Sequence, residues 1–130
     1  MTNSRPFVAI VDDDESVRES LPGLLAVLGF DSMAFVSADA FLASGKLEST
    51  NCLILDIAMP GMGGPELMRQ PSVRARGVPV IVITALQDDA IRQEMLSAGA
   101  ADCLFKPFSE TALIEAMEIA IGSGGPPKGG

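Results

Sequence analysis

The chain has 130 residues, of which 48% are hydrophobic and 20% are charged. This length supports one folded domain with one core, which excludes repeat arrays and multi-domain enzymes. Seventeen acidic against nine basic residues give a formal net charge of −8, which argues against direct binding of nucleic acid. No apolar run approaches the ~20 residues of a membrane-spanning helix, and the N-terminus lacks the apolar region of a secretory signal. We therefore expect a cytoplasmic protein that does not bind membranes.

The residue types that are missing narrow the chemistry further. The sequence contains no histidine, which excludes Ser-His-Asp and Cys-His catalysis and zinc sites that use histidine. Acid-base chemistry would therefore fall to carboxylates or lysine. Cys52 and Cys103 are too few for a four-cysteine metal site, and we expect both to be reduced thiols in the core.

Five apolar runs of strand length, rich in β-branched residues, recur along the chain. They are Phe7 to Val11, Met33 to Phe35, Cys52 to Leu55, Val80 to Ile83 and Cys103 to Phe105. The strongest of them are continuously apolar instead of alternating. Such runs are typical of a parallel sheet whose two faces are both covered by helices.

Helical periodicity fills the intervals between these runs. The first helix carries one apolar stripe, formed by Val17, Leu21, Leu24, Leu25 and Leu28. Pro22 lies inside this stripe and removes a backbone donor, so we expect a bend there. A third helix is expected to begin at Pro65 and to be stopped by Pro71, which would make it unusually short.

Capping residues mark the predicted helix ends. The predicted N-caps are Asp14 or one of its neighbours, Ser37, Asp88 and Ser109, and the predicted C-terminal stops are Gly45 and Gly99. Strand and helix thus alternate five times, which predicts a doubly wound α/β fold with a parallel sheet. Residues 122–130 hold five glycines and two prolines, and we expect a flexible tail or linker there.

Polar residues follow the predicted strands, at the edge where open α/β sheets bind ligands. The acidic residues 12–15 follow the first run, Asp56 the third, Thr84 the fourth and Lys106 the fifth. Helix capping accounts for one or two acids of the first group, but not for Asp56. Carboxylates crowded in this way need a counter-ion, which a hard divalent cation such as Mg²⁺ would provide, with Lys106 as a second positive charge.

These residue types together favour phosphoryl transfer. With a cation and Lys106 neutralising the incoming negative charge, the carboxylate of Asp56 can attack a phosphoryl group and form an aspartyl phosphate. Thr84 would donate its hydroxyl to one phosphoryl oxygen, and Lys106 would pair with another.

The constellation resembles the response-regulator receiver domain of bacterial two-component systems. Asp12 and Asp13, Asp56 with the Met59-Pro60 loop after it, Thr84-Ala85 and Lys106-Pro107 occur in the family's order. The resemblance covers about residues 6–121. It implies a flavodoxin-like sheet of order 2-1-3-4-5, with helices on both faces and the site between the first and third strands.

The same resemblance implies roles for the site residues. Asp13 and Asp56 would ligate Mg²⁺ directly and Asp12 through water, with the backbone carbonyl of Ala58 as a further ligand. Mn²⁺ would be able to substitute for Mg²⁺. The resemblance also implies a cis peptide bond between Lys106 and Pro107.

A receiver domain is a phosphoprotein that is switched by its partners. The resemblance implies a sensor histidine kinase or a phosphotransfer protein as the phosphoryl donor. It implies an output domain or partner protein, most often transcriptional, and a homodimer as one form of the phosphorylated state. Beyond self-phosphorylation from a donor and slow autodephosphorylation, no enzyme activity is expected.

The sequence departs from the family pattern at several positions. Cys103 stands three residues before Lys106, where the family usually carries an aromatic switch residue. Ala58 and Leu86 are apolar at positions where many relatives carry polar side chains over the phosphoryl group. Gly63 stands where aspartate is common in the loop after Asp56.

Other functions compete with phosphorylation-dependent signalling. A receiver-like module that is not phosphorylated and acts by binding or dimerisation is favoured by Cys103 and disfavoured by the complete acidic set. A phosphohydrolase of the dehalogenase-like class needs a second aspartate two residues after the nucleophile, where Ala58 stands. The sequence lacks the glycine-rich patterns that are typical of nucleotide-binding sites.

Overall fold

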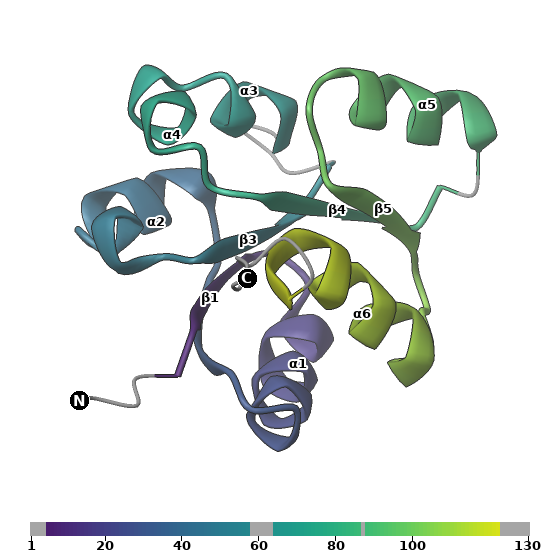
Figure 1. The fold of residues 1–130 in the computed structure, drawn as a ribbon, viewed down its shortest axis with the longest axis horizontal. Coiled ribbons are helices and arrows are strands. Elements are labelled where there is room, and N and C mark those ends of the chain that lie inside the picture. The colour runs from purple at the N-terminus through teal and green to yellow at the C-terminus, as the bar shows by residue number, and fades with distance from the viewer. Residues whose placement is uncertain (1–4, 58–63, 87, 123–130) are drawn as a thin grey trace.

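A central sheet of five parallel strands organises the molecule (Figure 1). This computed structural model describes residues 5–57, 64–86 and 88–122. In chain order the strands are β1 (Phe7–Val11), β2 (Asp31–Phe35), β3 (Cys52–Asp56), β4 (Val80–Thr84) and β5 (Asp102–Phe105). They lie in the order β2-β1-β3-β4-β5, with every neighbouring pair parallel. The predicted fold class and strand order are confirmed.

In the described residues, six α-helices and two further helical segments connect and cover the strands. They are α1 (Glu15–Val27), α2 (Ala38–Ala43), η1 (Leu47–Ser49), α3 (Gly64–Met68), α4 (Pro71–Arg76), α5 (Asp89–Ser97), α6 (Glu110–Met117) and η2 (Glu118–Gly122). All four predicted N-caps are confirmed: the side chains of Asp14, Ser37, Asp88 and Ser109 each accept a hydrogen bond from a backbone N–H in the first turn. Gly99 follows the C-cap of α5 with a φ of +111°, a conformation that glycine adopts without strain.

The interval between β3 and β4 differs from the prediction. We expected Pro71 only to stop the third helix, but it begins a separate helix, α4. Proline has a fixed φ and no N–H, which suits the first turn of a helix, and Gln70 before it is extended, as residues before proline prefer. α3 is short, as predicted. Pro22 lies inside α1, which runs as one helix from Glu15 to Val27, and the bend expected at Pro22 stays a prediction.

Strand β2 also begins earlier than predicted, at Asp31 instead of Met33. Its first two residues pair in register with Phe7 and Val8 of β1. β2 is an edge strand, where polar residues are tolerated because one side of the strand faces solvent. The apolar run from which the strand was predicted therefore covers only the C-terminal part of β2.

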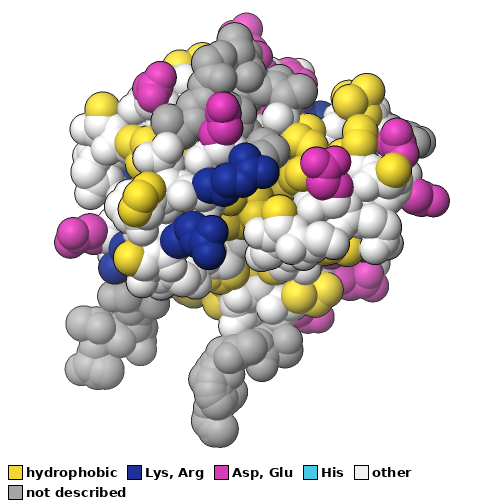
Figure 2. All heavy atoms as spheres, turned by 90° about the horizontal axis from the view of Figure 1, so that it is seen from above, with side chains coloured by type: hydrophobic (Ala, Val, Ile, Leu, Met, Phe, Trp, Pro, Cys, Tyr) yellow, Lys and Arg dark blue, Asp and Glu magenta, His cyan; other side chains and the backbone are white. Residues whose placement is uncertain are grey.

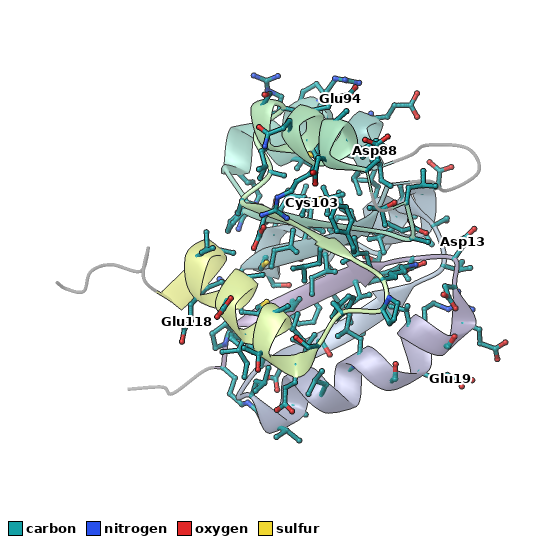
Figure 3. The ribbon with its side chains drawn as sticks, turned by 90° about the vertical axis from the view of Figure 1, so that its right-hand side faces the viewer. Asp13, Glu19, Asp88, Glu94, Cys103 and Glu118 are labelled. Atoms are coloured by element: carbon teal, nitrogen blue, oxygen red, sulfur yellow. The ribbon has the colours of Figure 1, made fainter. Side chains whose placement is uncertain are left out.

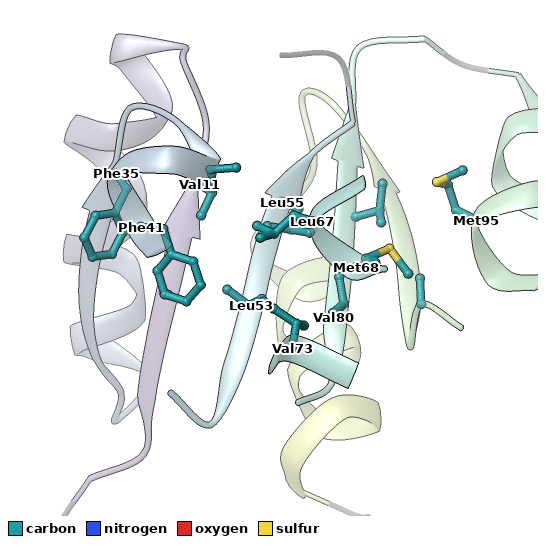
Figure 4. Packing of buried hydrophobic residues seen from close by; sticks show 14 of the residues in the cluster. Val11, Phe35, Phe41, Leu53, Leu55, Leu67, Met68, Val73, Val80 and Met95 are labelled. Atoms are coloured by element: carbon teal, nitrogen blue, oxygen red, sulfur yellow. The ribbon is translucent and has the colours of Figure 1, made fainter. Parts of the chain in front are cut away.

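The helices form a layer on each face of the sheet, and each layer buries its own apolar cluster (Figure 1). On one face, α1 and α6 bury Leu21, Leu25 and Leu113 against the sheet. On the other face, residues of α2 to α5 pack around the sheet, and the rings of Phe35 and Phe41 meet edge to face with centroids 5.3 Å apart (Figure 4). Burying such rings removes a large apolar area from water, at about 25 cal/mol per Å².

The two cysteines lie in different layers. Cys52 belongs to the cluster under α1 and α6, and Cys103 to the cluster under α2 to α5. Both are buried and free, as predicted. In the described part of the chain, no helix combines the length and the hydrophobicity needed to cross a membrane.

Candidate functional site

The carboxyl ends of four strands bring the predicted site residues to one edge of the sheet. Asp56 and Thr84 are the last residues of β3 and β4, Asp12 directly follows β1, and Lys106 directly follows β5. The parallel register sets Asp56 beside Ile83 of β4, so the strand ends are level with each other. Asp12, Asp56 and Thr84 are buried, with exposed fractions of 0%, 7% and 1%. Buried polar groups of this kind need partners, because an unpaired one is strongly destabilising.

Lys106 supplies the positive charge at this edge. Its Nζ lies 2.9 Å from Asp12 Oδ2, 3.8 Å from Asp56 Oδ2 and 3.8 Å from Asp14 Oδ2. Its backbone N–H donates a 2.7 Å hydrogen bond to the carbonyl of Thr84, which ties the start of the β5–α6 connection to β4. The peptide bond between Lys106 and Pro107 is cis, which confirms the expectation from the resemblance.

The pKa of Lys106 shows which effect dominates around its ammonium group. Burial favours the neutral amine and by itself lowers the pKa of Lys106. The hydrogen bond to Asp12 and the negative charges of Asp12, Asp56 and Asp14 together outweigh burial, and the pKa of Lys106 rises above its ordinary value of 10.5. The lysine is therefore held in its charged form.

The carboxylates outnumber this single ammonium group. One carboxylate oxygen from each of Asp12, Asp13 and Asp56 lies within 4.8 Å of the other two. Asp12 and Asp56 are buried, whereas Asp13 is exposed on the rim of the molecule (Figure 3). Hard divalent cations prefer such oxygen donors, and Mg²⁺ usually keeps several waters beside one or two carboxylates. The donor set fits Mg²⁺, and the predicted carbonyl ligand, Ala58, lies outside the described residues.

Two residues that the sequence reasoning did not assign to the site contact Asp12 of the acidic cluster. Asp14 caps α1 and also faces Lys106, and its backbone N–H donates a 2.9 Å hydrogen bond to Asp12 Oδ1. The guanidinium of Arg18, one turn into α1, donates to the backbone carbonyl of Asp12 at 3.1 Å. The first of these contacts is an Asx turn, which the Asp-X-Asp spacing could have indicated. Nothing in the sequence indicated the contact between Arg18 and the carbonyl of Asp12.

Asp14 itself has a lowered pKa. The hydroxyl and the backbone N–H of Ser16 both donate to its carboxylate, and these two hydrogen bonds are the main cause. Asp14 therefore stays charged at neutral pH, which suits both its cap position and its place near Lys106.

A groove of about 670 Å³ adjoins the site. Asp14 and Lys106 line it at the edge of the sheet, and residues of α1 and of the β5–α6 connection, including Leu21 and Phe108, line much of the rest. The groove thus runs from α1 to the edge of the acidic cluster.

This fold and site define a class of protein. The family model of the response regulator receiver domain matches residues 8–118, and the chain belongs to that family. It is 39% identical over 122 residues to the transcriptional regulatory protein FixJ of Azorhizobium caulinodans, a match that covers 94% of this chain and 57% of that protein. FixJ of Rhizobium meliloti is 42% identical over 113 residues, covering 87% of this chain and 55% of FixJ. The chain thus spans a little over half the length of these relatives.

Solved structures agree with this assignment. The crystal structure of FixJ-N superposes with a TM-score of 0.77 at 40% identity, covering 90% of this chain and 94% of FixJ-N. The response regulator StyR superposes with a TM-score of 0.79 at 43% identity, covering 90% of this chain and 59% of StyR. The predicted family is therefore confirmed.

Proposed function

We propose that this chain is a switch that is set by Mg²⁺-dependent phosphorylation of Asp56. The observation that carries the proposal is the position of Lys106, whose ammonium group lies 3.8 Å from Asp56 beside the carboxylate cluster of Asp12, Asp13 and Asp56. A structural ion pair would need one carboxylate for one lysine. The additional acids, Asp12 and Asp13, provide the oxygen ligands for a cation that phosphoryl transfer requires.

The phosphoryl donor is a phosphohistidine on a sensor histidine kinase or a phosphotransfer protein. A carboxylate oxygen of Asp56 forms a bond to phosphorus while the phosphorus–nitrogen bond breaks, and the histidine nitrogen keeps the electron pair. Lys106 pairs with one phosphoryl oxygen, and the hydroxyl of Thr84 donates to another. Asp13, Asp56 and the backbone carbonyl of Ala58 would hold Mg²⁺ directly and Asp12 would hold it through water. The bound cation, for which Mn²⁺ could substitute, would neutralise charge on the phosphoryl oxygens.

The groove beside α1 and the similarity to the FixJ proteins indicate the partners of this chain. The groove beside α1 receives the donor protein, because it opens at Lys106 and Asp14. The output is transcriptional, as in the FixJ proteins, and acts through an output domain or a partner protein in the cytoplasm. Within the chain, residues 6–121 form the receiver domain and residues 122–130 a tail or linker, and phosphorylation favours a homodimer.

Intact-mass spectrometry tests the proposal. Incubation with acetyl phosphate or phosphoramidate and Mg²⁺ should add one phosphate to the wild type and none after chelation of Mg²⁺. Asp56→Asn should not be labelled, whereas Asp88→Asn, which changes an exposed aspartate at the start of α5, should be labelled normally. Retained labelling in Asp56→Asn would show that another residue accepts the phosphoryl group, and an unlabelled wild type would leave the unphosphorylated binding module as the better function.

A further inference from the structure

A group of arginines stands out on this acidic chain. Arg69 directly follows α3, and Arg74 and Arg76 lie in the last turn of α4. All three are exposed. Within the described residues their side chains make no hydrogen bond or ion pair, whereas Arg5 and Arg92 are paired with aspartates. The three arginines form a basic surface on a protein of net charge −8.

A groove of about 220 Å³ runs beside these arginines, between α3–α4 and the C-terminal end of α5. Arg69 and Arg74 line it, and its other lining residues are Met68, Val73, Gly77, Val78, Val80, Ala98 and Gly99. Figure 2 shows basic side chains gathered on this face, next to hydrophobic side chains. The groove thus brings the charged side chains of Arg69 and Arg74 together with apolar residues such as Val73 and Val80.

Helix electrostatics explain only part of this arrangement. Cations are favoured near the C-terminus of a helix, which suits Arg74 and Arg76, but α4 has six residues and the effect falls off within one turn. It does not explain why Arg69 of the preceding segment lines the same groove. Arginine is also the cation that proteins use most at interfaces, because its planar group binds carboxylates in a bidentate manner.

We propose that this groove, here called the α3–α4 groove, docks a short segment of a partner protein in which carboxylate side chains flank an apolar side chain. The carboxylates would pair with Arg69 and Arg74, and the apolar side chain would enter the groove between them. A volume of about 220 Å³ lies below the ~300–1,000 Å³ typical of small-molecule sites, and it suits a single side chain. The groove lies at the opposite end of β4 from Thr84, away from the phosphorylation site.

Charge favours a protein segment over nucleic acid. A duplex is a long polyanion, and beyond the arginines it would meet the acidic surface of a chain with net charge −8. A short acidic segment contacts only the basic surface. At physiological salt, charges more than ~8 Å away are largely screened, so the rest of the protein repels such a segment only weakly.

Binding of a defined probe to the unphosphorylated protein tests this docking surface independently of the proposed function. The probe is a fluorescein-labelled peptide in which glutamate alternates with leucine, compared with the same peptide carrying lysine for glutamate and with a labelled DNA duplex. In ¹⁵N-labelled protein, the backbone amides of Gly77, Val78 and Gly99 should shift when the acidic peptide is added. Fluorescence anisotropy should give an affinity that falls as salt is raised.

Charge reversal identifies the side chains responsible. Arg69→Glu combined with Arg74→Glu should weaken peptide binding about tenfold, because two attractive contacts become repulsive. The control is Lys46→Glu, which reverses one charge at an exposed lysine that does not line the groove. If the double reversal does not fold, Arg69→Gln with Arg74→Gln removes the charges alone.

Four outcomes would overturn the proposal. They are the absence of acidic-peptide binding at millimolar concentration, equal binding by the arginine variants, an equal loss in Lys46→Glu, and tighter, arginine-dependent binding of the duplex. The last outcome would assign the surface to nucleic acid.

Discussion

The backbone N–H of Leu86 donates a 3.0 Å hydrogen bond to Thr84 Oγ1. The hydroxyl that ends β4 is therefore tied to the segment that leads into α5, and its own proton is still available to a phosphoryl oxygen. α5 is in turn tied to β5, because Arg92 donates to the carbonyl of Cys103 and pairs with Asp102. A displacement of the Thr84 hydroxyl thus has a continuous route of hydrogen bonds to α5 and β5.

The first prediction follows from this route. Hydrogen exchange of the wild type with beryllofluoride, a phosphoryl mimic, and Mg²⁺ should show altered protection across residues 84–110. Thr84→Val keeps the shape but removes the hydroxyl, and should confine the change to the vicinity of Asp56. It should also destabilise the protein by about 1 kcal/mol, because the N–H of Leu86 loses its acceptor.

Thr84→Ser is the matched control for this experiment, since it keeps the hydroxyl and removes only the methyl group. Its exchange pattern should follow the wild type. A full response in Thr84→Val would show that the signal leaves the site by another route, for example through Lys106.

The second prediction concerns Mg²⁺ and Asp13. Mg²⁺ should raise the melting temperature, because a ligand that binds only the native state stabilises it by about 1.4 kcal/mol at roughly tenfold its dissociation constant. Asp13→Asn should remove most of this rise and should slightly raise the melting temperature without Mg²⁺, since one crowded negative charge is lost.

Glu19→Gln provides the comparison, because Glu19 is an exposed acid on α1 apart from the cluster (Figure 3). It should leave the response to Mg²⁺ intact. An undiminished response in Asp13→Asn would mean that the cation binds elsewhere.

The third prediction links alkaline stability to a buried thiol. Burial raises the pKa of the Cys52 thiol from 9.0 to about 12. Between these two pH values the unfolded chain loses the proton and the native chain keeps it, so the native state becomes less stable as pH rises. The expected slope is up to about 1.4 kcal/mol per pH unit for one such group.

Urea unfolding at several pH values between 8 and 10 measures this slope. The chain has no tyrosine, and the raised pKa of Lys106 adds to the loss only above its ordinary value of 10.5. Burial also raises the pKa of the Cys103 thiol from 9.0, so Cys103 contributes to the slope in the wild type and in Cys52→Ala alike. Cys52→Ala should be less stable at every pH, because it leaves a small cavity, but should show a shallower slope. An unchanged slope would assign the alkaline loss to other groups.

The sequence predicted the fold correctly where a single physical effect determined the pattern of residues. Continuous apolar runs located the strands, because burial on both faces leaves no room for polar residues. Asp56 and Thr84 are buried polar residues at the ends of otherwise apolar runs, where burial alone favours apolar side chains, so the sequence could single them out as candidate site residues.

The features that could not be predicted depend on two competing signals or on contacts distant in sequence. Pro71 both ends and begins a helix, and which role it takes depends on whether Val73 can reach the core, as it does in α4. The contact of Arg18 with the carbonyl of Asp12 requires α1 to leave β1 at a particular angle. The groove beside Arg69 and Arg74 forms only because Ala98 and Gly99, which are distant in sequence, lie against α3 and α4.

The last prediction concerns the lifetime of the aspartyl phosphate on Asp56. Its hydrolysis needs a water in line with phosphorus, and polar side chains two residues beyond Asp56 and Thr84 are the groups best placed to hold that water. Ala58 and Leu86 occupy these positions and offer no hydrogen bond, and the side chain of Leu86 is 55% exposed and free to be replaced without disturbing the core. We therefore expect slow autodephosphorylation, which suits control of transcription.

Ala58→Asn combined with Leu86→Glu should shorten this lifetime about tenfold, because both new side chains can orient the attacking water. The measurement is the decay of the phosphorylated mass after the donor is removed, in excess Mg²⁺. Val27→Glu, which places the same acidic group at a position on α1 that is 79% exposed, should decay like the wild type and so controls for the added charge. If the double variant decays no faster, water positioning does not set the lifetime, and the access of solvent to the Mg²⁺-bound phosphoryl group must set it instead.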